Sequence, residues 1–235
     1  MFVGVTVLAV SAIASSTNQT FSDFTTALPV KWGEALVIGF VGGWERWDNP
    51  KRGVRKLALR LRARNLPGVY VETVENHKRY LAIELVRRAL DWDGSGRLDA
   101  RERAAARIVL YGQSFGGAAV LKAARELEML EVPILLTVQV DSIGRDDALV
   151  PANVAAAANL FQRDFWPIRG EPRIRAADAA RTRMLGNFQY HYRGKKVDLS
   201  EETWVRRFFA GAHTKMEFDP EVWKQVEGLI LEVLR

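Results

Sequence analysis

The strongest constraint on the fold is an alternation along the chain between short apolar runs and longer amphipathic segments. The apolar runs predict buried strands at residues 35–41, 68–74, 107–111 and 134–140. The amphipathic segments predict helices at residues 51–64, 80–90, 117–130 and from about 219 onward. This alternation predicts an α/β fold with a mostly parallel central sheet flanked by helices. Such a sheet binds its ligands at the carboxyl ends of its strands.

The composition is suited to one hydrophobic core. The chain has 235 residues, of which 48% are apolar, and we expect a single domain at residues 33–235. It has no cysteine, which excludes disulfide bonds, thiolate zinc sites and a cysteine nucleophile. Only three histidines, His77, His191 and His213, can serve as a general base.

The first 32 residues differ from the rest of the chain. Residues 1–14 are uncharged and mostly apolar, and their Ala12-Ile13-Ala14 ending resembles the cleavage site of a signal peptide. They lack a basic start, so a buried first strand is the alternative. Residues 15–32 are polar and predict a linker. The N-terminus therefore predicts a secreted or periplasmic protein, and the alternative is a cytoplasmic one.

The formal net charge is +6, from 34 basic and 28 acidic side chains. The most basic stretch, residues 51–64, interleaves leucines with arginines and predicts a helix with one buried stripe and a solvated cationic face. The sequence has no nucleic-acid-binding motif, and the apolar run at residues 1–14 is too short to cross a bilayer. We expect no nucleic-acid partner and no transmembrane span, and the sequence leaves the oligomeric state open.

A glycine-flanked serine follows the third predicted strand. Gly112-Gln113-Ser114-Phe115-Gly116-Gly117 has the pattern G-x-S-x-G between a strand and a helix. Glycines suit a sharp turn that exposes Ser114 at the end of the strand. The following helix directs its N-terminus at the same point, so the backbone N–H of Phe115 can donate to a developing oxyanion. The alternative is a tight turn in which the serine only caps the helix.

This motif in this context resembles the nucleophile elbow of the α/β-hydrolase family, and the resemblance covers residues 33–235. It implies an acyl-serine mechanism with a second oxyanion donor after an earlier strand, where we place the N–H of Val41 in Gly39-Phe40-Val41-Gly42-Gly43. The family's order of serine, acid and histidine disfavours His77. Between the two remaining candidates, His213 lies in a loop of small residues before the last helix, as the family's general base does. The other, His191, lies in an alternating strand-like segment.

Four aspartates are candidates for the acid that orients the histidine. Asp141 directly ends the apolar run 134–140, where a carboxylate can accept the imidazole N–H, and we favour it. Asp198 is the runner-up, because many members of the family carry the acid one strand later. Asp146 and Asp147, in the loop after residue 141, are further rivals.

A calcium-binding pattern precedes the nucleophile strand, at residues 91–102. Oxygen-bearing side chains stand at positions 1, 3, 5, 9 and 12 and a glycine at position 6, which resembles an EF-hand loop. The expected ligands are Asp91, Asp93, Ser95, the backbone carbonyl of Arg97, Asp99 and Glu102. A single loop favours a structural Ca²⁺ ion over a regulatory one, so that chelation would lower thermal stability and activity together. An acidic turn that binds no ion is the alternative.

The stretch 142–186 is long for a connection and predicts a cap over the substrate pocket. Its aromatic and amide side chains, which include Phe161 and Gln162, could line an acyl pocket or pack the cap. The sequence as a whole predicts a serine hydrolase of the esterase or lipase type that acts on a small or lipid-like ester. The alternative is a catalytically silent hydrolase fold that binds calcium and a partner.

Overall fold

The structure, a computed structural model, describes residues 19–164, 168–204 and 211–235. It confirms the expected fold class, because six strands form one parallel sheet in the order β2-β1-β3-β4-β6-β8. The strands are β1 (Ala35–Val41), β2 (Val69–Glu75), β3 (Ile108–Gln113), β4 (Ile134–Val140), β6 (Val154–Gln162) and β8 (Arg183–Tyr190). Two short strands, β5 (Leu149–Val150) and β7 (Arg175–Ala176), pair with each other in a separate small sheet.

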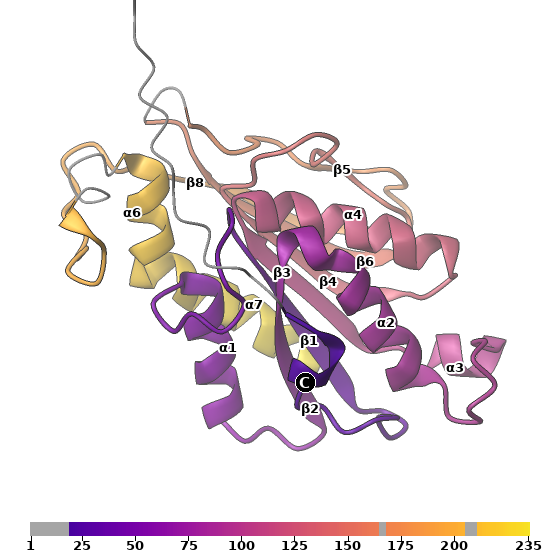
Figure 1. Ribbon diagram of the computed structural model, residues 1–235. Coiled ribbons are helices and arrows are strands. Elements are labelled where there is room, and N and C mark those ends of the chain that lie inside the picture. Colours follow the sequence, from indigo (N-terminus) through magenta and orange to yellow (C-terminus); the bar gives the residue numbers. More distant parts are fainter. Residues whose placement is uncertain (1–18, 165–167, 205–210) are drawn as a thin grey trace, which may run out of the picture.

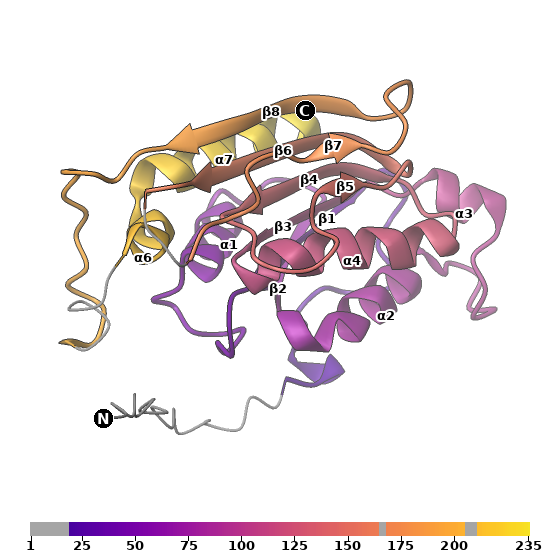
Figure 2. The ribbon, with the colours of Figure 1, turned by 90° about the horizontal axis from the view of Figure 1, so that it is seen from above.

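Helices cover both faces of the sheet (Figures 1 and 2). The helices are α1 (Gly53–Ala63), α2 (Arg79–Leu90), α3 (Ala100–Ala104), α4 (Phe115–Met129), α6 (Ala212–Phe218) and α7 (Pro220–Leu234). Two 3₁₀ turns, Phe21–Asp23 and Asn76–Lys78, complete the described elements. One core lies between the sheet and α2 with α4, and the other lies between the sheet and α1, α6 and α7.

The two cores follow from the period of two in a strand. In β1, the side chains of Leu36, Ile38 and Phe40 pack toward α2 and α4, whereas Val37 and Val41 pack toward α1 and α7. All seven residues of β1 are buried, as expected for a strand covered on both faces. Burial of both sides explains why the strand reads as a continuous apolar run rather than an alternating one.

The order of the strands fixes where a ligand can bind. From β1 the chain passes through α1 to β2 at one edge, and it then crosses back through α2 to β3 on the other side of β1. The connections leave in opposite directions at β1 and β3, which opens a crevice at their carboxyl ends. Ser114 follows β3 and the Gly42-Gly43 pair follows β1, so both lie at this crevice.

Two predicted segments have a different structure. The described part of residues 142–186, the segment predicted as a cap, contributes β6 to the central sheet between β4 and β8. It also supplies β5 and β7, which pair with each other in the small second sheet. The sequence did not indicate β6 because Ala156, Ala157 and Ala158 are small and give a weak apolar signal. They are nevertheless buried in the cores on both faces of the sheet. Residues 19–32 are also more than a linker, since Val30 lies in the core and Phe24 packs against it.

The predicted signal segment, residues 1–14, lies outside the described part of the chain. Among the helices that the structure describes, none is long and apolar enough to cross a membrane.

Candidate active site

Ser114 occupies a sharp turn between β3 and α4. Its backbone has φ +59° and ψ −126°, a conformation that residues with a side chain rarely adopt. The N–H of Ser114 donates to the carbonyl of Val140 (3.0 Å), and its own carbonyl accepts from Gly117 (2.9 Å) and Ile143 (3.1 Å). These bonds fix the turn against the ends of two elements. Strain of this kind is characteristic of functional sites.

The flanking glycines are required by close backbone contacts. A Cβ atom on Gly112 would lie 2.4 Å from the carbonyl oxygen of Gly116. A Cβ atom on Gly116 would lie 2.0 Å from the carbonyl oxygen of Phe40 in β1. Any larger residue at either position would push α4 away from the sheet. The sequence pattern G-x-S-x-G is therefore a consequence of packing, as expected of this turn.

Three side chains from distant parts of the sequence meet at this turn. The Oγ atom of Ser114 lies 3.1 Å from Nε2 of His213, and Nδ1 of His213 lies 2.6 Å from Oδ2 of Asp141. Ser114 follows β3, Asp141 follows β4, and His213 lies in the first turn of α6 rather than in a loop. Ser114 is 8% exposed, Asp141 is fully buried and the side chain of His213 is 18% exposed. The structure therefore brings together the three residues that the sequence favours.

Two residues to which sequence reasoning gave no role beside the acid hold the carboxylate of Asp141. The side chain of Gln162 donates to Oδ2 (3.0 Å), and its backbone N–H lies 3.2 Å from Oδ1. The N–H of Gly170 donates to Oδ1 (3.0 Å). Hydrogen bonds from neutral donors satisfy the buried charge and direct its remaining lone pairs at His213. Gln162 is the last residue of β6. A strand predicted at residues 154–162 would therefore have placed Gln162 at the carboxyl ends of the strands, beside Asp141.

The rival aspartates have other partners. Asp147 accepts the hydroxyl proton of Ser142 (2.7 Å), and the exposed Asp198 accepts the N–H of Ser200 (2.8 Å). Asp146 is exposed in the loop that follows β4. Neither His191 nor His77 approaches the serine: His191 is 3.5 Å from Asp164, and His77 is 3.4 Å from Glu75.

Of the two predicted oxyanion donors, Phe115 lies as expected. It is the first residue of α4, where backbone N–H groups have no partner inside the helix. Its N–H therefore remains available beside Ser114, at the positive end of the helix dipole. The side chain of Phe115 is 50% exposed, so it borders the entrance to the site.

The alternation of N–H groups along β1 favours Gly42 over the predicted Val41 as the second donor. Along β1 the N–H groups alternate: that of Ala35 donates to the segment entering β2 (2.7 Å), and that of Leu36 to the segment entering β3 (2.9 Å). Val41 has the parity of Ala35 and pairs with β2, so its N–H points away from Ser114. Gly42 has the opposite parity, and a Cβ on it would lie 3.2 Å from the Cβ of Ser114.

Asn76 holds the turn that follows β1. Its side-chain amide donates to the carbonyl oxygen of Val41 (3.0 Å) and to that of Gly43. Asn76 directly follows β2, so neighbouring strands of the sheet supply both the turn and its clamp. The glycine pair is thereby fixed next to the serine.

The predicted calcium loop joins α2 to α3 and lies at the opposite end of β3 from Ser114. Carboxylate oxygens of Asp91, Asp93 and Glu102 lie within 4.8 Å of one another. The N–H of Gly96 donates to Asp91 (3.0 Å), and Gly96 has φ +75°, the turn expected at this position. Of the six predicted ligands, these three carboxylates are brought together.

The remaining predicted ligands are close by but have bonds within the loop. The hydroxyl of Ser95 donates to the carbonyl oxygen of Arg97 (2.9 Å), and Asp99 caps α3 by accepting the N–H of Glu102 (2.8 Å). Hydrogen bonding to Ser95, whose backbone N–H donates to Oδ1 of Asp93 (2.9 Å), lowers the pKa of Asp93.

Comparisons with known proteins bear on the fold alone. The sequence matches no family model and no curated protein. A cutinase-like protein from Cryptococcus sp. has a similar structure, with TM-score 0.48 and 12% identity over 86% of this chain and 95% of that chain. An uncharacterized protein from Pseudomonas aeruginosa gives TM-score 0.43 and 12% identity over 86% of this chain and 52% of that chain.

Proposed function

We propose that the protein is a serine hydrolase that cleaves esters through an acyl-serine intermediate. The observation that carries this proposal is the continuous hydrogen-bonded chain from Ser114 through His213 to Asp141. A serine that only capped a helix would need neither a histidine at its hydroxyl nor a buried carboxylate behind that histidine. The proposal is favoured over a silent hydrolase fold for this reason.

The proposed reaction has two steps that use the same groups. The Oγ atom of Ser114 attacks the ester carbonyl carbon while Nε2 of His213 accepts the hydroxyl proton. His213 then gives this proton to the departing alcohol, and the acyl group remains on the serine. Water attacks the acyl-serine, with its proton passing to Nε2, and the proton returns to Oγ as the acid leaves. Asp141 keeps the Nδ1 proton in place and stabilises the imidazolium.

The negative oxygen of each tetrahedral intermediate needs two donors. We assign one to the N–H of Phe115 and the other to the Gly42-Gly43 turn, with Gly42 directed to the correct side of β1. Such donors act without reorganisation because the protein fixes them before the reaction begins. Asn76 contributes indirectly by holding the turn.

A fluorophosphonate probe tests the proposal directly, because it labels only an activated serine. Wild-type protein should be labelled, and Ser114→Ala should not. The matched control is Ser142→Ala, which removes a nearby buried hydroxyl that bonds to Asp147 and not to the histidine. Absence of labelling in the wild-type protein would refute the hydrolase assignment. A panel of p-nitrophenyl esters of increasing acyl length on the same sample would define the substrate.

We further propose that residues 91–102 bind one structural Ca²⁺ ion. The chemistry of the donor set fits a hard cation, since three carboxylates converge and the carbonyl of Arg97 lies in the same loop. One carboxylate oxygen, Oδ1 of Asp91, is buried and has no hydrogen-bond partner among the residues that the structure describes. A bound ion would neutralise the mutual repulsion of these carboxylates and join the end of α2 to the start of α3.

Tryptophan fluorescence offers a readout of calcium at this loop that is independent of catalysis. The backbone N–H of Trp92 donates to the carboxylate of Glu102 (2.8 Å). The centroid of the Trp92 ring lies 5.1 Å from that of the Trp32 ring. We expect calcium to change the emission of the wild-type protein and not that of Trp92→Phe. Calorimetry should show binding that Glu102→Gln abolishes and that Glu232→Gln, on the exposed side of α7, retains. Unchanged binding in Glu102→Gln would contradict the site.

A further inference from the structure

Residues 163–196 carry a net positive charge as large as that of the whole chain. This segment has nine basic residues and three acidic ones, Asp164, Glu171 and Asp178. Subtracting them from the totals of 34 and 28 leaves 25 basic and 25 acidic residues elsewhere, so the rest of the chain is neutral. Residues 51–64 are also basic, with seven basic residues and no acidic one. Most of that charge is compensated within the fold, by the ion pairs of Arg52, Lys56, Arg60, Arg62 and Arg64 with carboxylates.

The arginines of this segment are exposed and lack carboxylate partners. They are Arg163, Arg169, Arg173, Arg175, Arg181, Arg183 and Arg193. Among the residues that the structure describes, none of the seven side chains forms an ion pair. Several arginines elsewhere in the chain are paired instead: Arg62, Arg64 and Arg88 each lie within 2.7 Å of a carboxylate oxygen. Unpaired guanidinium groups remain available to bind an external anion.

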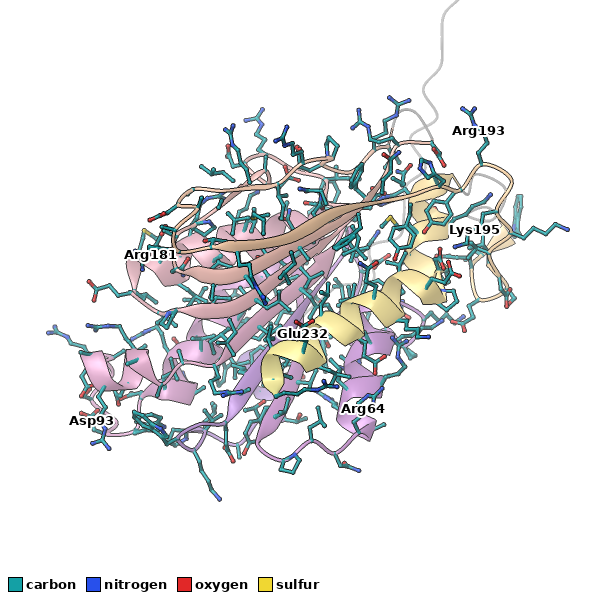
Figure 3. All side chains as sticks on the ribbon, turned by 180° about the vertical axis from the view of Figure 1, so that it is seen from behind. Arg64, Asp93, Arg181, Arg193, Lys195 and Glu232 are labelled. Carbon is teal, nitrogen blue, oxygen red and sulfur yellow. The ribbon has the colours of Figure 1, made fainter. Side chains whose placement is uncertain are left out.

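These arginines follow the free edge of the sheet. β8 is the last strand in the order, and Figure 3 shows Arg181 and Arg193 near its opposite ends. The eight residues of β8 extend over roughly 26 Å at about 3.3 Å each. Charges on an edge strand also prevent it from pairing with another chain. That role needs only charges on the strand itself, and it does not account for the arginines of the preceding loop.

The cationic segment borders the catalytic site. Arg163 follows Gln162, and Arg169 precedes Gly170, the two residues that hold the carboxylate of Asp141. Exposed apolar side chains lie at the same end of the sheet: Ile168 is 44% exposed and its carbonyl accepts from Gln162. Phe115, next to the serine, is half exposed as well. Cationic and apolar groups are thus exposed together around the entrance.

We propose that this edge, made of the described residues 163–164 and 168–196 together with Phe115, docks the protein on an anionic lipid bilayer. Arginines attract the negatively charged headgroups, and exposed apolar side chains enter the interface. Charge alone would suit nucleic acid equally, but the apolar groups at the entrance favour a lipid surface. If the proposed esterase chemistry holds, docking would present lipid esters to Ser114. The docking surface itself does not depend on that chemistry.

Vesicle sedimentation tests the surface with full-length Ser114→Ala, which cannot consume the lipid. It should sediment with vesicles of phosphatidylcholine and phosphatidylglycerol at 7:3 and not with phosphatidylcholine alone. High salt should weaken this binding. Each arginine near an anionic surface contributes about fivefold to affinity, so Arg181→Gln, Arg183→Gln and Arg193→Gln together should weaken binding on the order of 100-fold.

The matched control removes three exposed cations elsewhere, Lys31, Lys224 and Arg235, by substitution with glutamine. It changes the net charge equally and should weaken binding only a few-fold. Equal losses in the two triple variants would show that total charge, and not this edge, drives binding, and would overturn the proposal. So would absence of binding to the anionic vesicles, or tighter binding to duplex DNA than to them at the same salt concentration.

The experiment separates this proposal from the proposed function. Vesicle binding is measured without catalysis, and fluorophosphonate labelling is measured without vesicles. Protein that binds the vesicles but is not labelled would support the docking surface and refute the esterase proposal. Protein that is labelled but does not bind anionic vesicles would support the esterase proposal and refute the docking surface. The arginine variants should hydrolyse a soluble ester as the wild-type protein does, because none of the three arginines contacts the catalytic groups.

Discussion

The most informative single substitution is Gly170→Ala, because it moves the acid without removing any catalytic group. A Cβ on Gly170 would lie 2.2 Å from Oδ1 of Asp141, and ordinary contact begins at 3.4 Å, so about 1.2 Å of displacement is required. The carboxylate is fully buried and held by four hydrogen bonds, so the displacement must disturb its bond to His213. A misplacement of about 1 Å costs on the order of 100-fold in rate, or about 2.7 kcal/mol.

The assay is hydrolysis of a soluble short-chain ester, with circular dichroism to follow unfolding. We expect kcat of Gly170→Ala to fall on the order of 100-fold while KM changes little, since the binding groups remain. Overpacking should also lower stability by about 1 to 3 kcal/mol, so rates are measured well below the melting temperature. The matched control is Gly228→Ala in α7, where a Cβ meets nothing within 4 Å and kcat should not change. A kcat for Gly170→Ala within threefold of wild type would refute the assigned role of Asp141.

Three further predictions concern the acid, the calcium loop and pH. Asp141→Asn should lower kcat about 10⁴-fold, as loss of the correct tautomer does, and Asp198→Asn should leave kcat unchanged; equal effects would contradict the choice of acid. Calcium at 100 times its Kd should add about 2.7 kcal/mol to the free energy of unfolding, seen as a higher melting temperature that chelation reverses and that Glu102→Gln lacks. Backbone hydrogen bonds, first from Tyr192, lower the pKa of Asp164 in the folded state. The charged Asp164 therefore contributes about 1 to 2 kcal/mol to the free energy of unfolding at pH values above the ordinary carboxyl pKa, and this contribution is lost as pH falls through the lowered pKa. Asp164→Ala should accordingly be less stable than wild type at pH 7 and equally stable in acid. A stability difference that does not change with pH would contradict this prediction.

The fold was predictable wherever a strand carried large apolar side chains. β1 and β4 lie almost where their apolar runs predicted them. β6 was missed because its alanines carry little hydrophobic signal, although Ala156, Ala157 and Ala158 are buried. Burial of a small residue depends on neighbours that are distant in sequence, and local periodicity does not contain this information.

The residues of the candidate site also differ in whether the local sequence predicts them. Ser114 was predictable because its turn imposes glycines on the local sequence. The roles of Gln162 and Gly170 were not predictable from the sequence, because both residues act by holding the carboxylate of Asp141. Asp141 lies more than twenty residues away in the sequence and comes close only when β4 and β6 pair. The predicted second donor, Val41, and the one that the strand alternation favours, Gly42, differ by a single residue. In a strand one residue reverses the direction of the N–H, so alignment of glycines alone could not decide between Val41 and Gly42.

The position of the calcium loop sharpens what calcium removal should do. The loop precedes β3, whereas Ser114 follows it, so the six residues of a fully buried strand, roughly 20 Å, separate the two sites. Asp91, Asp93 and Glu102 contact the loop itself, and none bonds to the catalytic residues. A structural ion in this place can alter activity only through the population of folded protein. Chelation should therefore lower the melting temperature while kcat measured far below it remains unchanged, and a fall in kcat at full folding would require a coupling that this sheet does not provide.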